Sequence, residues 1–337
     1  MPNTVLVTGA AGFIGSNFVR HWRGAQPEDH VIAFDLLTYA GNRANLADVA
    51  DDITFVPGDI RDQRLVERVL EEHKVTIVVN FAAESHNSYA ILRPVDFFET
   101  NAMGTVTLLE AIRRAGRGSI RFHQISTCEV YGDMDLDDPG AFTEESPYRP
   151  RTPYNAAKAC SDHAVRAYGL TYGIPVTITN CSNNYGPYQF PEKVIPLFVT
   201  NALQGKSLPV YESSQNRREW LHVEDHCRAI AAVLQRGRIG ETYHVGSGIE
   251  ADVATLARTI LGELGLSEDM MRTVPDRPSH DRRYLLDSSK LRGELGWAPA
   301  VDFADGLKRT IMWYRDNEEW WRPLIGRSPV AEETAWL

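Results

Sequence analysis

A glycine-spaced loop directly after a short apolar segment constrains the fold of this chain more than any other feature. Residues 4–8 read as a buried strand, and the next residues, before a segment with helical spacing, are Gly9-Ala10-Ala11-Gly12-Phe13-Ile14-Gly15. Glycines let the backbone turn tightly and approach a pyrophosphate, whose charge is favoured at a helix N-terminus. The pattern predicts a strand, a phosphate-binding turn and a helix, with cofactor contacts at Gly9, Gly12, Phe13, Ile14 and Gly15.

An aspartate at the end of the next predicted strand narrows the choice of cofactor. Asp35 closes the apolar residues 31–34 and stands about 20 residues after Gly15. A carboxylate there would bind a ribose 2'-hydroxyl and repel a 2'-phosphate, which favours NAD over NADP. A structural turn followed by an ordinary strand-end aspartate is the plainer alternative. Asp59, after the third predicted strand, is expected near the adenine, although a plain turn would also explain it.

Short apolar segments alternate with helix-like stretches through the first half of the chain. Residues 4–8, 31–35, 53–56, 76–80 and 121–126 read as strands, and residues 94–115 and 153–172 as helices. This alternation predicts an α/β fold with a Rossmann-like, doubly wound parallel sheet. After about residue 180 the helix-like residues 223–235, 253–264 and 303–316 predict a smaller C-terminal α/β substrate lobe. We expect an NAD-binding domain over residues 1–180 and a substrate-binding lobe over residues 181–337, interleaved with the first.

Charge and cysteine usage exclude several classes of partner. The net charge of −10 argues against a nucleic-acid surface. No stretch approaches the roughly 18 consecutive apolar residues of a membrane span, and the first residues show no secretory signal. The cysteines Cys128, Cys160, Cys181 and Cys227 are widely spaced without a CxxC pair, so no disulfide framework or metal site is expected. We expect a cytoplasmic protein that binds a small molecule.

A tyrosine and a lysine at helical spacing point to redox chemistry at a hydroxyl group. Tyr154 and Lys158 lie four residues apart, so both side chains should share one helix face. An ammonium near a phenol favours the phenolate, which makes the tyrosine a better base. Such a pair is common by chance and then marks only an exposed helix face. The glycine loop upstream, and Thr127 at the end of a predicted strand, favour the catalytic interpretation.

Several longer motifs make the chain resemble an extended short-chain dehydrogenase/reductase, most closely the dTDP-glucose 4,6-dehydratases, over about residues 3–316. The resemblance rests on residues 9–15, 35–42, 82–86, Thr127 with Glu129, Tyr154 with Lys158, and residues 180–187, 190–196, 218–221 and 276–284. It implies NAD contacts also at Ile60, Ala82, Ala83, Tyr154 and Lys158. It implies nucleotide-sugar contacts at Ser85, His86, Asn180, Asn184, Lys193, Arg218, Arg277 and His280. A homodimer built on residues 94–115 and 153–172 is the family expectation.

The resemblance also implies a three-stage reaction in which NAD stays bound. Tyr154, helped by Thr127 and Lys158, would oxidise the hexose at C4. Glu129 would then take the acidified C5 proton while the C6 hydroxyl leaves as water, and hydride would return to C6. The expected product is a 4-keto-6-deoxy sugar, made by a hydro-lyase of deoxysugar biosynthesis.

The chain departs from the dehydratase pattern at three places. Cys128 stands where an aspartate normally precedes the glutamate, Asn87-Ser88-Tyr89-Ala90 replaces Val-Asp-Arg-Ser, and His244 replaces an asparagine. A thiol, with a reference pKa of about 8.5, is already protonated at neutral pH, so Cys128 is predicted as a catalytic acid. A thiol is also a weak hydrogen-bond donor, and Cys128 could equally be an inert wall with water as the acid.

The presence of Glu129 distinguishes between the remaining candidate functions. A carboxylate at the end of a buried strand is rarely kept for packing, and a simple 4-epimerase needs no base at C5. A 5,6-dehydratase that leaves an alkene, or a nucleotide-glucuronate decarboxylase, would keep C4 oxidation and Glu129 but end differently. A non-catalytic NAD-binding sensor should have lost Tyr154, Lys158 or Glu129, and this chain retains all three.

Overall fold

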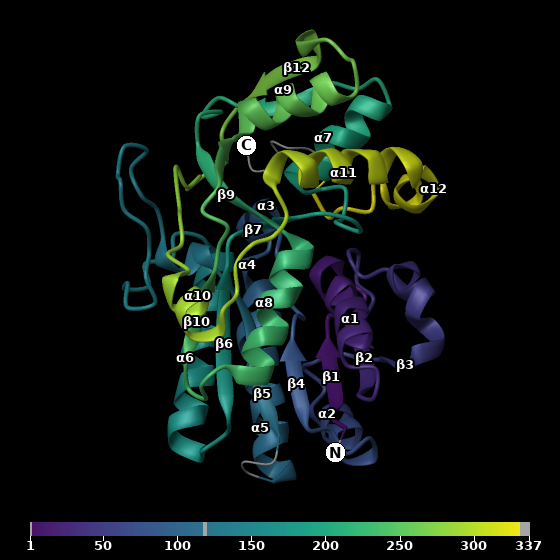
Figure 1. Ribbon diagram of the computed structural model, residues 1–337, viewed down its shortest axis with the longest axis vertical. Helices are drawn as coiled ribbons and strands as arrows, with labels where there is room; N and C mark the ends of the chain where they lie inside the picture. Colours follow the sequence, from purple (N-terminus) through teal and green to yellow (C-terminus); the bar gives the residue numbers. More distant parts are fainter. Residues whose placement is uncertain (1, 117–119, 331–337) are drawn as a thin grey trace.

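A parallel sheet forms the centre of the computed structural model, which describes residues 2–116 and 120–330 (Figure 1). The sheet confirms the expected Rossmann-like α/β fold. In spatial order its strands are β10 (Thr242–Val245), β6 (Val176–Cys181), β5 (Arg121–Thr127), β4 (Ile77–Asn80), β1 (Thr4–Thr8), β2 (His30–Asp35) and β3 (Ile53–Pro57). All neighbours pair in parallel, so the carboxyl ends meet at one edge.

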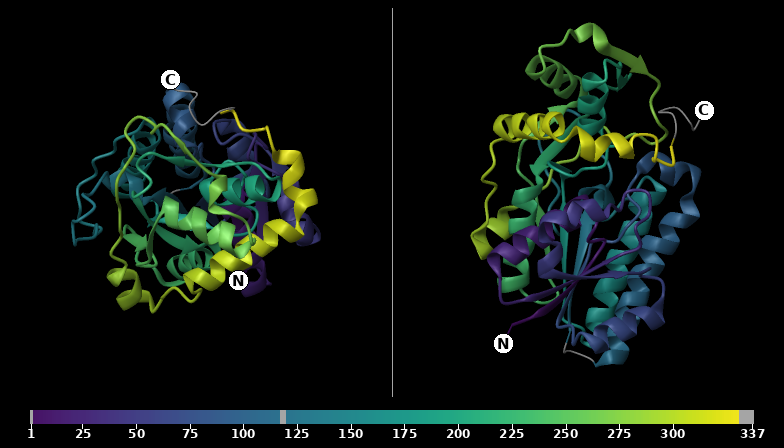
Figure 2. Two further views of the ribbon diagram at one scale, coloured as in Figure 1. Left: turned by 90° about the horizontal axis from the view of Figure 1, so that it is seen from above. Right: turned by 90° about the vertical axis from the view of Figure 1, so that its right-hand side faces the viewer.

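Two helical layers cover the sheet, one on each face, as the right-hand view of Figure 2 shows. One layer holds α2 (Gln63–Glu72), α5 (Gly104–Ala115) and α6 (Pro153–Tyr172), which contact each other in that order. The other holds α1 (Phe13–Ala25) and α8 (Val223–Arg236). Apolar side chains from alternate positions of each central strand fill both interfaces, since successive strand residues point to opposite faces.

The predicted helix over residues 94–115 forms in three pieces. They are α4 (Pro94–Phe97), a π-helical turn (Phe98–Met103) and α5, and the short α3 (Asn87–Leu92) precedes them. A π turn inserts one extra residue into the hydrogen-bond ladder, so the apolar face changes direction at this point. Sequence periodicity alone does not reveal such an insertion.

The helix α6 has the predicted bounds because both of its ends are marked in the sequence. Thr152 accepts a hydrogen bond from the backbone N–H of Asn155 at 3.2 Å, and Pro153 occupies the first turn. Gly173 ends the helix at a φ of +71°, a conformation that glycine adopts without strain. Tyr154 and Lys158 therefore have fixed places on the first turns.

A smaller lobe stands over the carboxyl ends of the sheet (Figure 1). It consists of a sheet of β7 (Asn183–Tyr185), β9 (Arg217–His222) and β11 (Glu250–Asp252), a sheet of β8 (Leu208–Tyr211) and β12 (Met271–Val274), and the helices α7 (Val194–Leu203), α9 (Val253–Glu263), α11 (Phe303–Asp316) and α12 (Glu318–Trp321). The short helix α10 (Ser289–Leu295) packs near β10. The division at residue 180 stays a prediction, since β10 and α8 return to the large sheet.

In the part of the chain that the structure describes, every helix is too short or too polar to cross a bilayer.

Candidate active site

Two adjoining cavities open at the carboxyl edge of the large sheet. One has a volume of about 270 Å³ and is lined by the glycine loop, the end of β5, the first turns of α6 and the segment after β6. The other has a volume of about 150 Å³ and lies over the ends of β2 and β3. Gly9, Gly12, Phe81 and Ala83 line both. Ligand sites of open parallel sheets form at this edge.

The glycine loop has a shape that side chains would block. Gly9 has a φ of +64°, and a Cβ atom there would lie 2.7 Å from the backbone nitrogen of Ala82. A Cβ atom on Gly15 would lie 2.2 Å from the carbonyl oxygen of Gly9. The backbone therefore curls closely around the start of α1, and Phe13 and Ile14 extend over the larger cavity. This cradle fits a pyrophosphate at the helix N-terminus.

The carboxylates predicted to contact the adenosine both line the smaller cavity. Asp35 accepts hydrogen bonds from the backbone N–H of Ala11 at 2.9 Å and of Leu37 at 2.7 Å. Burial raises the pKa of Asp35, and these two hydrogen bonds oppose the rise. Asp59 pairs instead with Arg61, with 2.7 Å between the closest atoms. Ile60, Ala82 and Ala83 also line this cavity, whereas the predicted cofactor contacts Phe13, Ile14, Gly15, Tyr154 and Lys158 line the adjoining larger one.

Tyr154, Lys158 and Thr127 line the larger cavity together, as the spacing predicted. Lys158 Nζ donates to the carbonyl oxygen of Ile125 at 2.5 Å. Burial raises the pKa of Tyr154 well above its usual value, the negative charge of Glu129 adds to the rise, and a hydrogen bond with Thr127 opposes it. The Lys158 ammonium is directed at this backbone carbonyl, burial lowers the pKa of Lys158, and its predicted effect on the tyrosine stays a prediction.

Glu129 lines the same cavity and receives a hydrogen bond from outside it. Asn87 Nδ2 donates to Glu129 Oε2 at 3.0 Å. The backbone N–H of Glu129 donates to Thr127 Oγ1 at 3.3 Å, which holds the turn after β5. A base and a tyrosine therefore face one volume, which suits proton removal next to a newly formed ketone.

Cys128 lies behind the cavity. Its side chain is 1% exposed and packs with Val130, Tyr131, Tyr284 and Leu286, and it is absent from the cavity wall. Burial raises the pKa of its thiol well above the usual value, and the charge of Glu129 adds to this. The prediction of an acid role stays untested, but this placement favours the alternative of a packed wall residue.

Three residues predicted to bind the nucleotide sugar line the larger cavity, and a fourth, Arg277, has an unpaired nitrogen atom. Ser85, Asn184 and Lys193 line the larger cavity, and Lys193 Nζ donates to the carbonyl oxygen of Ser85 at 2.6 Å. Burial lowers the pKa of Lys193, and the charge of Glu192 opposes this. Arg277 Nη1 is buried without a hydrogen-bond partner among the described residues. A buried, unpaired guanidinium nitrogen calls for an acceptor such as a phosphate oxygen.

The other predicted contacts are held by the protein itself. Asn180 Nδ2 donates to the carbonyl oxygen of Thr127 at 3.1 Å, behind the cavity wall. Arg218 Nη2 donates to the carbonyl oxygen of Asp281 at 2.6 Å. Burial lowers the pKa of both His86 and His280 to about 3, so both rings are neutral at pH 7. His86 accepts from the N–H of Tyr89 at 3.2 Å and thereby caps α3.

Sequence reasoning missed Glu192, a buried carboxylate at the cavity wall. It accepts hydrogen bonds from Tyr39 at 3.0 Å and from Ser328 at 2.8 Å. Glu192 also lines a cavity of about 810 Å³ beneath residues 324–330, so it separates the two volumes. Glu192 lies directly before Lys193 within the motif of residues 190–196, and this position could have marked it as a candidate site residue.

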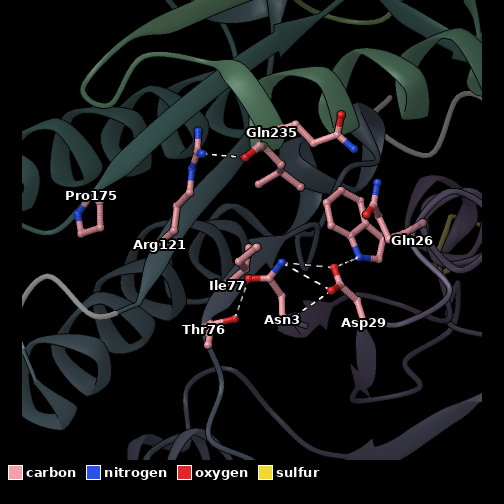
Figure 3. Close-up of a pocket in the computed structure, with 10 residues that line it drawn as sticks. Asn3, Gln26, Asp29, Thr76, Ile77, Arg121, Pro175 and Gln235 are labelled. Atoms are coloured by element: carbon pink, nitrogen blue, oxygen red, sulfur yellow. Dashed lines mark hydrogen bonds between the residues drawn. The ribbon is translucent and has the colours of Figure 1, made fainter. Parts of the chain in front are cut away.

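A cavity of about 460 Å³ lies at the opposite, amino-terminal edge of the large sheet (Figure 3). Asn3 and Trp22 donate to Asp29 there, and Arg121 donates to the carbonyl oxygen of Leu234 at 2.6 Å, while Arg121 Nε is unpaired among the described residues. None of the predicted catalytic residues lines it. Size therefore does not identify the active site of this fold.

Comparison with known proteins agrees with the geometry. Residues 6–310 match the family model described as GDP-mannose 4,6 dehydratase. The chain is 53% identical to a dTDP-glucose 4,6-dehydratase of Streptomyces niveus over 95% of each chain, and 51% identical to that of Mycobacterium tuberculosis over 95% and 96%. A dTDP-glucose 4,6-dehydratase of Streptomyces venezuelae, solved with NAD bound, superposes with a TM-score of 0.91 at 52% identity, covering 95% of this chain and 99% of that one.

Proposed function

The chain belongs to the family of dTDP-glucose 4,6-dehydratases, and we propose from this premise that it converts dTDP-glucose to dTDP-4-keto-6-deoxyglucose. It is an NAD-dependent hydro-lyase. The observation that carries the proposed residue roles is the shared cavity. Glu129 lines the same volume as Tyr154, Lys158 and the glycine loop. An oxidation and an elimination can therefore act on one bound hexose.

Each residue of the cavity has a role that its position supports. The glycine loop would hold NAD, which would supply the hydride acceptor for C4 and the hydride donor for C6. Tyr154 accepts the proton of the C4 hydroxyl, with the Thr127 hydroxyl beside it. Glu129 accepts the C5 proton, the C6 hydroxyl leaves with a proton as water, and a proton is later added at C5. Water is the proposed acid, because the Cys128 thiol is buried behind the wall.

The diphosphate of the substrate belongs between the two lobes. Arg277, with its unpaired buried Nη1, and Lys193 supply the positive charge. His86 and His280 supply none at pH 7, because burial lowers the pKa of each to about 3. The lobe over residues 181–337 is thus proposed to hold the nucleotide, and residues 1–180 the NAD.

The test is incubation of the purified protein with dTDP-glucose, UDP-glucose, UDP-N-acetylglucosamine and UDP-glucuronate, followed by mass and proton spectra of the products. The expected product has lost one water and shows a C6 methyl group beside a C4 ketone. Vinylic protons, or loss of carbon dioxide, would contradict the proposal. Glu129→Gln is the matched variant, since it retains the shape of the side chain but removes the base.

We also propose a cytoplasmic homodimer. Val95 of α4, Met103 of the π-helical turn and Leu170 of α6 expose large apolar side chains, with exposures of 63%, 57% and 89%. Exposed apolar side chains along one helical layer favour association. The four cysteines are unpaired, which suits a reducing compartment. Sedimentation of the protein should give twice the chain mass, and Leu170→Glu should shift it towards the monomer.

A further inference from the structure

Asn87 connects the catalytic carboxylate to the start of α6. Its Nδ2 atom donates to Glu129 Oε2 at 3.0 Å, across 42 positions of sequence. Its Oδ1 atom accepts from Thr152 Oγ1 at 3.1 Å, across 65 positions. Asn87 is half-buried and is not part of the cavity wall, so it contacts Glu129 from behind.

The Thr152 hydroxyl holds the oxygen end of the Asn87 amide. Its oxygen already accepts from the backbone N–H of Asn155, as the N-cap of α6. A hydroxyl has one hydrogen, and in this arrangement Thr152 directs it to Asn87 Oδ1. An ionised carboxylate only accepts, so the NH₂ end of the amide faces Glu129 and the Oδ1 end is turned to Thr152. The helix cap thus holds the oxygen end of an amide whose other end is a donor at the active site.

This hydrogen bond leaves one oxygen of Glu129 for chemistry. Among residues 2–116 and 120–330, Asn87 makes the one hydrogen bond that the Glu129 carboxylate accepts, and Oε1 accepts none. A carboxylate without a partner rotates about its terminal torsion, which is broad for glutamate. Fixing Oε2 holds the plane of the group and keeps Oε1 available to accept a proton from a ligand in the cavity.

We propose that Asn87 is a positioning residue that orients Glu129 for removal of the C5 proton, through the amide that Thr152 holds. The inference rests on the proposed function, because it concerns one step of that reaction. It is specific to this chain in one respect: the dehydratases that the sequence resembles have a valine after the histidine of this motif. A valine side chain has no hydrogen-bond donor, so this contact needs the asparagine of this chain.

The experiment compares Asn87→Leu, which preserves the shape, with Asn87→Val, which has the residue of the relatives and is compatible with the fold. For each we expect kcat with dTDP-glucose to fall about tenfold or more, with KM within about twofold of the parent value, because a hydrogen bond to a charged group is lost only at this step. C4 oxidation should proceed, so the near-ultraviolet absorbance of reduced nicotinamide should build up during turnover.

The matched control is Asn3→Leu at the other edge of the sheet. Asn3 Nδ2 also donates to a carboxylate, that of Asp29, at 3.3 Å (Figure 3). This variant should leave kcat and the absorbance unchanged. The inference is overturned if both Asn87 variants retain kcat within about twofold, or if kcat falls without any build-up of reduced nicotinamide. Failure of the parent protein to release water from dTDP-glucose would instead overturn the proposed function.

Discussion

The two edges of the large sheet differ in how their polar groups are satisfied. At the amino-terminal edge, Asp29 accepts from Asn3 and Trp22, and Arg121 covers the last carbonyl groups of α8 (Figure 3). At the carboxyl edge, Glu129 accepts one hydrogen bond on one oxygen, and Arg277 Nη1 is unpaired among the described residues. The cavity at the amino-terminal edge is the larger one. Arg121 Nε at that edge is also unpaired among the described residues, so the side chains that line the cavity, more than volume or unpaired atoms, distinguish the edge that binds ligands.

The largest contrast should come from removing one carboxylate at each edge. Glu129→Gln should lower kcat about 1000-fold while C4 oxidation continues, because a general base contributes roughly 100- to 10,000-fold. Asp29→Asn should leave kcat unchanged but lower the free energy of unfolding by about 1–3 kcal/mol, since its donors lose a charged acceptor. Steady-state rates and urea unfolding measure the two effects. Equal losses of kcat in Glu129→Gln and Asp29→Asn would contradict the difference between the two edges.

A pH series should show that ionisation of Asp281 at the carboxyl edge lowers the free energy of unfolding. Asp281 is fully buried, and burial, followed by the charge of Glu129, raises its pKa to about 6. Because this value exceeds the unfolded one, the contribution of Asp281 is fully present below about pH 4 and is lost as pH rises through about 6. Between these two pH ranges, the contribution of Asp281 to the free energy of unfolding changes by about 3 kcal/mol.

Asp281→Asn removes this titration. The variant should therefore match the parent protein near pH 4 and exceed its free energy of unfolding at pH 7. Urea unfolding at several pH values measures the difference. A variant that is less stable than the parent at pH 7 would show that the arginines around Asp281 outweigh its burial.

A pair of arginine variants should separate binding from stability. Arg277→Met should raise KM for dTDP-glucose about tenfold or more with little change in unfolding, because its free Nη1 has no protein partner to lose. Arg121→Met should leave KM unchanged and lower the free energy of unfolding by about 1–3 kcal/mol, because the carbonyls of Val233 and Leu234 lose their donor. A raised KM in Arg121→Met, with an unchanged KM in Arg277→Met, would show that the ligand binds at the amino-terminal edge.

The smallest effect is expected at Cys128. Cys128→Ala should retain kcat within about threefold and lower the free energy of unfolding by about 1 kcal/mol, because it leaves a small void among Val130, Tyr131 and Tyr284. Cys128→Ser is the polar control of similar size. A loss of kcat near 100-fold in the alanine variant, with full recovery in Cys128→Asp, would restore the thiol as the acid.

The sequence was most informative where function depends on local geometry. The glycine loop and the Tyr154–Lys158 pair were predictable because a few adjacent residues define a turn or a helix face. The contact of Asn87 with Glu129 was not, since it joins residues 42 positions apart and depends on the angle between α3 and the end of β5. The ligand contact implied for Asn180 stays a prediction: its Nδ2 bonds to the Thr127 backbone, and its Oδ1 is unpaired among the described residues.

The late return of β10 to the large sheet has a consequence for the order in which the molecule can be completed. Strand β6 ends at Cys181, and its outer neighbour β10 begins only at Thr242, after the first parts of the small lobe. During synthesis, the edge of β6 is exposed until those residues leave the ribosome, and an unpaired edge strand favours association with other chains. A fragment ending near residue 180 should therefore aggregate, whereas one extended through β10 has the complete sheet.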